Sequence, residues 1–489
     1  MLHLLILLPL FAALFVLVGA PARKTALGTA AAMFLISLFT LFSYDKAGPQ
    51  FQFISSSVIA AAWDLKYLLA ADGLSLVMLL LTGLVTLAAV WVTPKIEKRE
   101  NFFYACVLFI AAGVAGAFAS QDLFFFYAFH ELALIPTFLL IGIWGSGERH
   151  TAAWKITIYL ALGSFILLIG LVALYYALPA ELRTFDMIKL QALAGSNVIP
   201  AAAQVTPYLL LLTGFGILVS LFPFHTWAPS AYASAPTPAA MLHAGVLKKF
   251  GLYGLLRLAV PLLPEAARQY VWLLLILLVG NIIYVGLATL AQRKLDLMLG
   301  YSSVMHMGYI FLGIASLNLV GLSGASMLMF AHGLSIAALF AVAGQLRHRS
   351  TSLSFDSLGG LAKSLPFLSV AFGLAAFASL GLPGFANFAS EMMVFFGAWK
   401  NGPASLSFSG MQIATICALW GVVISAVYML RAYRAVFFGE PHRDTIAATD
   451  PKFTLRIPVL LLLGALLLTG FFPETLLGYI RPSMEALLK

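Results

Sequence analysis

Long apolar runs recur along almost the whole chain, each about as long as a bilayer-spanning helix of roughly 20 residues. They lie near 2–20, 25–43, 73–93, 103–119, 121–143, 154–178, 205–222, 239–260, 270–290, 299–316, 323–346, 366–399, 410–436 and 454–476. Only helices and closed barrels satisfy their backbone polar groups in hydrocarbon, and runs of this length are typical of helices. The sequence therefore predicts an all-α polytopic membrane protein with about 14 transmembrane helices.

Composition excludes a water-facing globule. The chain is 62% hydrophobic and 10% charged, whereas a soluble domain carries about 25% charged residues. The net charge of +9 does not indicate nucleic-acid binding, because the basic residues lie in short loops and form no basic domain. Most lysines and arginines fall in alternate loops, which predicts that both termini lie outside, on the periplasmic side. The expected surroundings are a lipid bilayer.

The chain lacks the motifs of a cofactor site. It has no glycine-rich nucleotide loop, and its two cysteines, Cys106 and Cys417, lie far apart in apolar runs. No histidine spacing suggests a metal site. We therefore expect no cofactor and no metal in this chain, and any redox group would belong to a partner. The longest loop, 44–72, has room only for a hairpin or a short amphipathic piece.

Two apolar runs are interrupted. Residues 220–238, SLFPFHTWAPSAYASAPTP, contain four prolines, and GLPGF at 381–385 divides the run 366–399. Irregular backbone at membrane depth is tolerated only where protein or water satisfies it, and paired broken helices indicate an inverted repeat with ion sites between the halves. The alternative for 220–238 is a simple loop.

Four ionisable residues lie inside apolar runs. Glu131 lies mid-run in FFFYAFHELALIPTFLLIGIWG, Lys248 and Lys249 lie in AAMLHAGVLKKFGLYGLL, and Glu391 follows the second break. A charge at a helix centre costs on the order of 3 kcal/mol, so several in one chain require a reason. One reading is structural, with a carboxylate neutralising a lysine. The other is a proton or ion relay.

Histidines lie in the same runs. His306 and His332 occupy successive runs, and His243 lies six residues before Lys249. Histidine titrates near neutral pH and can pass a proton through its two nitrogens. The alternative is a hydrogen bond between helices. His130 and His225 lie nearer to flanks or breaks, so they carry less weight as members of a relay.

These segments resemble the antiporter-like membrane subunits of respiratory complex I and its relatives, the Mrp antiporters and membrane-bound hydrogenases. The resemblance runs from about 100 to 440 and rests on the order of several long stretches. They are FFFYAFHELALIPTFLLIGIWG, FPFHTWAPSAYASAPTPAAMLHAGVLKKFGLYGLLR, QRKLDLMLGYSSVMHMGYI, AHGLSIAALF and LGLPGFANFASEMMVFFG.

The resemblance implies fourteen helices, with two inverted five-helix repeats in which helices 7 and 12 are broken. Residues 1–100 would hold helices 1–3, 101–260 and 261–436 the two repeats, and 437–489 helix 14 and a tail. It also implies a relay. Glu131 matches the family's fifth-helix glutamate, Lys249 its central lysine, His306 and His332 the residues that connect the halves, and Glu391 the acid at the exit side.

Within the family the chain is most similar to the chain M branch, also called chain 4. That branch carries an acid in helix 12, where chains L and N and the Mrp D-type subunit carry lysine, and Glu391 occupies this place. The chain also stops soon after the last run, whereas chain L would add a long lateral helix.

One position departs from the family. A lysine is expected five residues before the proline of the PFH motif, as the partner of the helix-5 glutamate, but the residue there is Leu218. Lys248 and Lys249 lie about 100° apart on a helix, so our hypothesis is that Lys248 turns toward Glu131 and replaces the missing partner. The alternative is that this chain has lost part of its pump.

The function that the resemblance implies is that of a proton-translocating subunit of NADH:quinone oxidoreductase in the inner (plasma) membrane. The chain would work between antiporter-like neighbours, as part of an enzyme whose redox sites lie in partner chains. The alternatives are an Mrp-type cation/proton antiporter subunit, a subunit of a ferredoxin- or hydrogenase-linked complex, and a structural scaffold. Gene neighbours would separate the first two.

Overall fold

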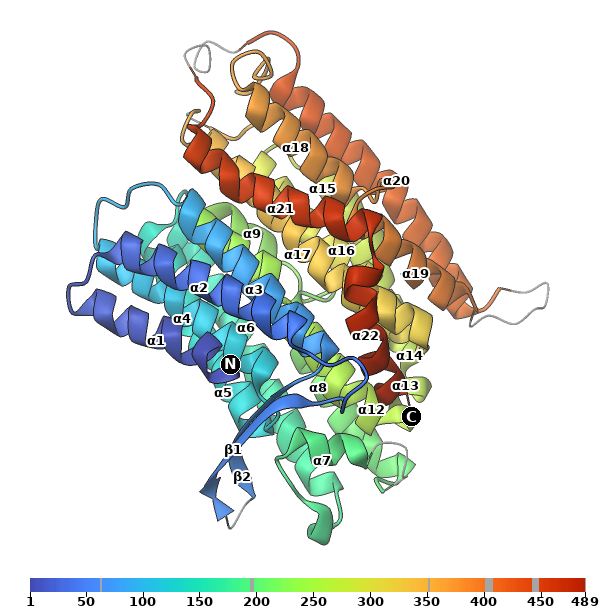
Figure 1. The fold of residues 1–489 in the computed structure, drawn as a ribbon. Helices are drawn as coiled ribbons and strands as arrows, with labels where there is room; N and C mark the ends of the chain where they lie inside the picture. The colour runs from blue at the N-terminus through green and yellow to red at the C-terminus, as the bar shows by residue number, and fades with distance from the viewer. Residues whose placement is uncertain (62–63, 194–197, 351, 401–407, 442–447, 489) are drawn as a thin grey trace.

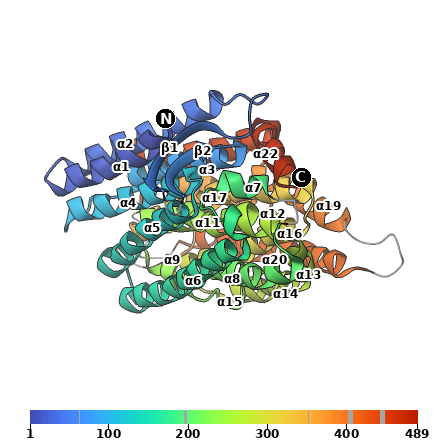
Figure 2. The same cartoon turned by 90° about the horizontal axis from the view of Figure 1, so that it is seen from below.

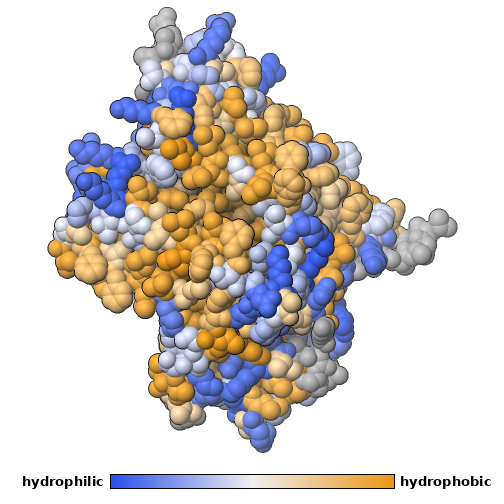
Figure 3. All heavy atoms as spheres, in the orientation of Figure 1, coloured by the Kyte–Doolittle hydropathy of each residue, from blue (hydrophilic) through white to orange (hydrophobic). Residues whose placement is uncertain are grey.

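The computed structural model describes residues 1–61, 64–193, 198–350, 352–400, 408–441 and 448–488. Long helices run side by side, with the N-terminal helices on one side of the molecule and the C-terminal helices on the other (Figure 1). Apolar residues cover large areas of the surface over these helices, and hydrophilic residues gather mainly toward the ends (Figure 3). This arrangement is that of a multi-pass membrane protein.

The helices follow the predicted runs closely. The first half contains α1 (Leu2–Leu17), α2 (Ala22–Phe42), α3 (Gly73–Val92), α4 (Glu100–Ala119), α5 (Leu123–Trp144), α6 (Arg149–Ala177), α7 (Met187–Ala192), α8 (Ala201–Val219), α9 (Trp227–Ser234), α10 (Thr237–Leu242), α11 (Lys249–Gly254) and α12 (Val260–Leu262). The second half contains α13 (Pro264–Gln269), α14 (Val271–Val279), α15 (Val285–Ala291), α16 (Leu295–Ala315), α17 (Leu319–Arg347), α18 (Pro366–Ser379), α19 (Ala386–Lys400), α20 (Gly410–Phe437), α21 (Phe453–Phe471) and α22 (Glu474–Leu487).

In the described part, eleven helices are long and apolar enough to cross a membrane. The other predicted spans correspond to shorter pieces: α1, the segmented helix of residues 237–262, and the pair α18 and α19. The polytopic all-helical class is thus confirmed. The count of fourteen and the division into two inverted repeats stay predictions.

Burial separates inner from outer helices. The spanning parts of α3 and α17 are fully buried, whereas fewer than half of the spanning residues of α5, α6, α20 and α21 are buried. Helix α17 packs against α3, α10, α16 and α19. It therefore lies at the centre of the bundle, where a polar side chain is shielded from lipid.

Both predicted breaks are present. Between α8 and α9, the side chain of Asn281 accepts a hydrogen bond from the Phe222 N–H (2.6 Å) and donates one to the Ser220 carbonyl (3.2 Å). Between α18 and α19, the chain turns through Gly381 and Gly384, whose φ angles of +69° and +98° favour glycine. Backbone freed at membrane depth is thus bonded by protein, as the bilayer requires.

The segmented helix of residues 237–262 contains two π turns, His243–Leu247 and Leu255–Ala259. In the first, the Lys248 N–H bonds to the His243 carbonyl at 3.0 Å, five residues back. Such turns insert one residue into the helix and often lie at functional sites. The first π turn directly precedes both buried lysines.

The loop 44–72 carries a hairpin, as predicted. Strands β1 (Gln52–Ala60) and β2 (Leu65–Ala71) pair antiparallel, with Ser56 opposite Leu68. The hairpin and α7 lie on the same side of the molecule, the near side in the view from below (Figure 2). Helix α22 was not predicted. It is a short amphipathic helix that packs on α3 and α17.

A fully buried ion pair joins α3 to the end of the segmented helix. Asp72 caps α3 by accepting from the Ser75 N–H (3.0 Å), and its carboxylate also bonds the Arg257 guanidinium. Both side chains have no exposed surface. Arg257 also donates to the Ser75 hydroxyl at 3.3 Å. The pair holds together two segments that are far apart in the sequence.

We expect Arg257→Gln to destabilise the protein strongly, because Asp72 would remain as a buried charge without its partner, at a cost of about 3–5 kcal/mol. The measurement is the thermal unfolding midpoint in detergent. Arg268→Gln is the control, since its pair with Glu265 is exposed (67% and 47%) and contributes about 0–1 kcal/mol. Equal midpoints for the two variants would contradict a stabilising role of the buried pair.

Candidate functional site

The central lysine is bonded to one of the predicted histidines. Lys249 Nζ lies 2.9 Å from His332 Nδ1 on α17 and donates to the Ala244 carbonyl in the π turn at 2.6 Å. Lys249 has no exposed surface and His332 is almost fully buried. A proton can pass between an amine and an imidazole at this distance. The structure thus brings together two of the predicted site residues.

His306 continues the set toward the second break. The ring centroids of His306 and His332 lie 5.7 Å apart. His306 Nδ1 lies 2.8 Å from the Ser302 carbonyl, and its Nε2 lies 2.9 Å from the carbonyl of Ser379, the last residue of α18. A neutral imidazole donates from only one nitrogen, and carbonyl oxygens only accept. A neutral ring can donate to one of these two carbonyls at a time, whereas a ring with two protons can donate to both.

Glu391 packs against the second break. It is buried on α19, and a Cβ added to Gly381 would collide with its Oε2. Its Oε1 has no hydrogen-bond partner within the described part of the chain. The amide of Asn387, one turn earlier on the same face, is equally unpartnered there. The carboxyl group and the amide are thus positioned to bind water.

Lys248 does not take the place that the sequence hypothesis gave it. Its Nζ lies 3.5 Å from the Ser303 carbonyl on α16 and 5.6 Å from the centre of the Tyr232 ring on α9. Within the described residues it forms no ion pair with Glu131. The structure thus shows no direct Lys248–Glu131 contact in the described residues, because the side chain turns toward α9 and α16, and the role of Lys248 in the relay stays a prediction.

Glu131 has other partners on the outer side of the first half. Its carboxylate accepts a hydrogen bond from the Ser164 hydroxyl on α6. Its Oε1 also lies 3.4 Å from His130 Nδ1, close enough for an ion pair. The Glu131 side chain is 37% exposed in the isolated chain. This acid is therefore not buried without partners, contrary to what the missing lysine at Leu218 alone would suggest.

His130, which carried little weight in the sequence, lies beside Glu131, and His243 lies on the segment that carries the lysines. His130 stacks on Phe250, with ring centroids 4.0 Å apart and planes 15° apart. His243 Nδ1 lies 3.1 Å from the Tyr232 hydroxyl. Their position on facing segments depends on how α5 packs on residues 237–262, and spacing along the chain does not report that packing.

Several further buried polar atoms near these residues have no protein partner within the described segments. They are His243 Nε2, Ser303 Oγ, Tyr309 Oη and His332 Nε2. Buried polar groups are normally hydrogen-bonded to protein or ordered water. Together with Glu391 and Asn387 they are buried polar atoms at which water could bind.

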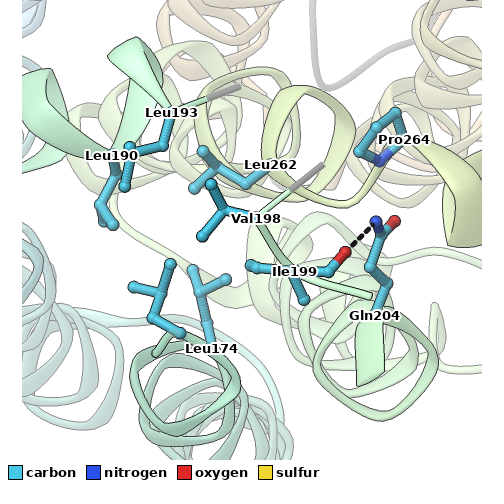
Figure 4. Close-up of a pocket in the computed structure, with 9 residues that line it drawn as sticks. Leu174, Leu190, Leu193, Val198, Ile199, Gln204, Leu262 and Pro264 are labelled. Carbon is cyan, nitrogen blue, oxygen red and sulfur yellow. Dashed lines mark hydrogen bonds between the residues drawn. The ribbon is translucent and has the colours of Figure 1, made fainter. Parts of the chain in front are cut away.

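A metal centre has no support in the described residues, where no group of three His, Cys, Asp or Glu side chains could hold an ion. A small apolar pocket lies between α6, α7, α8 and α12 and contains none of the predicted site residues (Figure 4). Its one amide, Gln204, donates to the Ile199 carbonyl at 2.9 Å and accepts from the Glu265 N–H at 3.0 Å. Gln204 thus joins loop backbone to α8.

A bundle of membrane helices with two broken spans and buried titratable residues at its centre is the architecture of an ion-translocating membrane subunit. Comparison with known proteins agrees. A family model described as NADH:quinone oxidoreductase/Mrp antiporter, TM, matches residues 120–417. The chain belongs to this family.

Curated relatives cover most of the chain. It is 38% identical to the NAD(P)H-quinone oxidoreductase chain 4 2 of Microcystis aeruginosa, over 89% of this chain and 79% of the relative. It is 34% identical to the NAD(P)H-quinone oxidoreductase chain 4 of Gloeobacter violaceus, over 99% of this chain and 92% of the relative.

Solved structures share the fold over the full length. A chain of respiratory complex I from Thermus thermophilus with bound NADH matches with a TM-score of 0.89 and 27% identity, covering 100% of both chains. A chain of the Mrp complex from Dietzia sp. matches with a TM-score of 0.85 and 22% identity, covering 100% of this chain and 99% of that one. The second likeness concerns the fold alone.

Gly381→Ala tests the contact between the second break and Glu391. We expect a lower thermal unfolding midpoint, because the new methyl group would meet the carboxylate and the left-handed backbone costs about 1–2 kcal/mol for a residue other than glycine. Gly464→Ala on α21 is the control, since nothing lies within 4 Å of that position. The control should keep or slightly raise the midpoint. Equal loss in both variants would argue against the contact.

Proposed function

We propose that this chain is the proton-translocating membrane subunit of an NADH:quinone oxidoreductase, of the chain M type. The observation that carries the proposal is the buried set from Lys249 through His332 and His306 to the second break, where Glu391 lies. Electron transfer and quinone reduction would occur in partner chains. This subunit would carry protons for the enzyme, although the subunit itself has no redox site.

The contacts suggest how a proton would move through the second half. A charged Lys249 can give a proton to His332 Nδ1, and the neutral amine can take one back. The His306 ring lies next along the set, with one nitrogen near each of two backbone carbonyls. Water bound at the unpartnered atoms of Tyr309, Asn387 and Glu391 would complete the path. Glu391 would then release the proton.

Two observations support the chain M assignment over an Mrp-type antiporter. An acid, Glu391, stands where the resemblance assigns lysine to the Mrp D-type subunit. The curated relatives at 34–38% identity carry the name chain 4, whereas the Mrp structure is 22% identical. We assign the ion as a proton because amine, imidazole and carboxyl groups in series exchange protons.

The proposed location is the inner (plasma) membrane, with both termini on the periplasmic side, because lysines and arginines prefer the cytoplasmic loops. The partners would be other membrane subunits of the complex on either side, together with lipid. The outer faces of α6 and α20 carry large exposed apolar side chains that suit such contacts. They are Trp154, Ile158, Leu162 and Phe165 on α6, and Ile413, Trp420, Val423 and Val427 on α20.

Lys249→Met should abolish proton pumping in the assembled complex, because methionine fills the space but carries no proton. The measurement is quenching of a pH-sensitive dye in inverted membrane vesicles during NADH oxidation. Lys400→Met is the control, since this lysine is exposed at the end of α19, and it should pump normally. Full pumping by Lys249→Met would instead support a structural scaffold.

Glu391→Gln should also lower pumping, by at least about tenfold, because the amide keeps the shape of the side chain but cannot release a proton. The same vesicle assay applies, together with the amount of assembled complex. The matched control is Glu474→Gln, whose side chain is 66% exposed and pairs with Arg481 at the surface. If both variants pump alike, Glu391 is not on the path.

A further inference from the structure

The first half of the bundle lacks a lysine that could connect Glu131 to the central pair. Leu218 is buried, and Lys248 turns to Ser303 on α16 and to the Tyr232 ring. Within the described residues, the polar partners of Glu131 are His130 and Ser164. A path from Glu131 to Lys249 must therefore use groups other than a third lysine.

His130 is held between Glu131 and the segment that carries the lysines. Its side chain is only 3% exposed, with Nδ1 3.4 Å from Glu131 Oε1. On its other side, the ring stacks on Phe250, the residue that follows Lys249. The stack fixes the plane of the imidazole and leaves Nδ1 near the carboxylate, without a direct hydrogen bond in the described residues.

His243 lies at the start of the π turn that leads to the lysines. Its carbonyl accepts from the Lys248 N–H, and its ring Nδ1 lies beside the Tyr232 hydroxyl. Its Nε2 is buried without a protein partner in the described residues. The π turn that begins at His243 packs against α5, the helix that carries His130. His243 thus lies on the segment that joins α5 to both lysines.

We propose that His130 and His243 form a proton-carrying link that joins Glu131 to the lysine pair, in place of a lysine at position 218. This inference rests on the proposed function. The link places two imidazoles in series between a carboxyl group at the outer side of α5 and the amines at the centre of the bundle.

The proton balance of the link is simple. The Glu131 carboxyl group gives its proton to His130 Nδ1, and the ring releases the proton on Nε2. His243 takes up a proton at Nε2 and releases one from Nδ1, next to the Tyr232 hydroxyl, to a neutral lysine amine, which becomes an ammonium. Water is the carrier where two groups are not in direct contact. Both rings end neutral, with the proton on the other nitrogen.

The rival explanation is structural, since a stack on Phe250 and a bond to Tyr232 would also hold α5 and α9 against residues 237–262. Glutamine separates the two explanations, because it fills much of the space and can hydrogen-bond but cannot pass a proton in this way. The variants are His130→Gln, His243→Gln and the double variant, each in the assembled complex in membrane vesicles.

We expect each single variant to assemble normally. The protons moved per electron pair should fall at least about tenfold. The double variant should lose no more than either single one, because two groups in series fail together. His3→Gln is the matched control: it also loses a histidine bond to a hydroxyl, that of Ser55 at 2.8 Å, and it should pump normally.

Four results would overturn the link. They are normal pumping in either single variant, losses that multiply in the double variant, loss of assembly with a normal proton ratio in the complex that remains, and an equal loss in His3→Gln. Lys249→Met in the same vesicles distinguishes failure of the histidine link from failure of the proposed function. If Lys249→Met stops pumping while both histidine variants pump, only the link is wrong. If all three pump, the proposed function itself is wrong.

Discussion

Breaking a helix at membrane depth frees backbone groups that lipid cannot bond, and the rest of this structure depends on how they are satisfied. At the first break, one side chain, Asn281, bonds both the Phe222 N–H and the Ser220 carbonyl. At the second break, His306 bonds the last carbonyl of α18. The second break thus has a titratable imidazole where any hydrogen-bond donor would satisfy the Ser379 carbonyl.

The central lysine likewise combines a structural contact with a group that can exchange a proton. Lys249 bonds the Ala244 carbonyl in the π turn and His332 on α17, whose spanning part is fully buried. Charge in an apolar interior is tolerated only when it is hydrogen-bonded. The contacts that make Lys249 acceptable in the bundle are therefore also the contacts through which it can exchange a proton.

The sequence predicted the spans well because bilayer thickness fixes the length of an apolar helix. The run 73–93 corresponds to α3 at Gly73–Val92, and both breaks lie where proline and glycine interrupt apolar runs. The last run, 454–476, continued too far, because Pro473 ends it and the amphipathic α22 begins. The roles of the six site residues in the relay remain predictions. The structure gives the contacts that such roles require.

The direction of Lys248 was not predictable. An ideal helix separates Lys248 from Lys249 by about 100°, but the π turn before them changes which way the segment faces. The apolar pattern of the segment does not reveal this turn. The closeness of His130 to residues 237–262 was hidden for another reason. It depends on α5 packing against a segment about a hundred residues later, so neither run reveals it alone.

The buried pair of Asp72 and Arg257 has a consequence for biogenesis. Residues 237–262 carry Lys248, Lys249 and Arg257, and each basic residue near a helix centre raises the free energy of insertion by about 2.5–3.5 kcal/mol. This segment alone is therefore a poor substrate for release into lipid. Asp72, synthesised much earlier, offers the charge that Arg257 needs. The insertion machinery would have to retain the early helices until this later span arrives, so the order of synthesis is part of how the bundle is built.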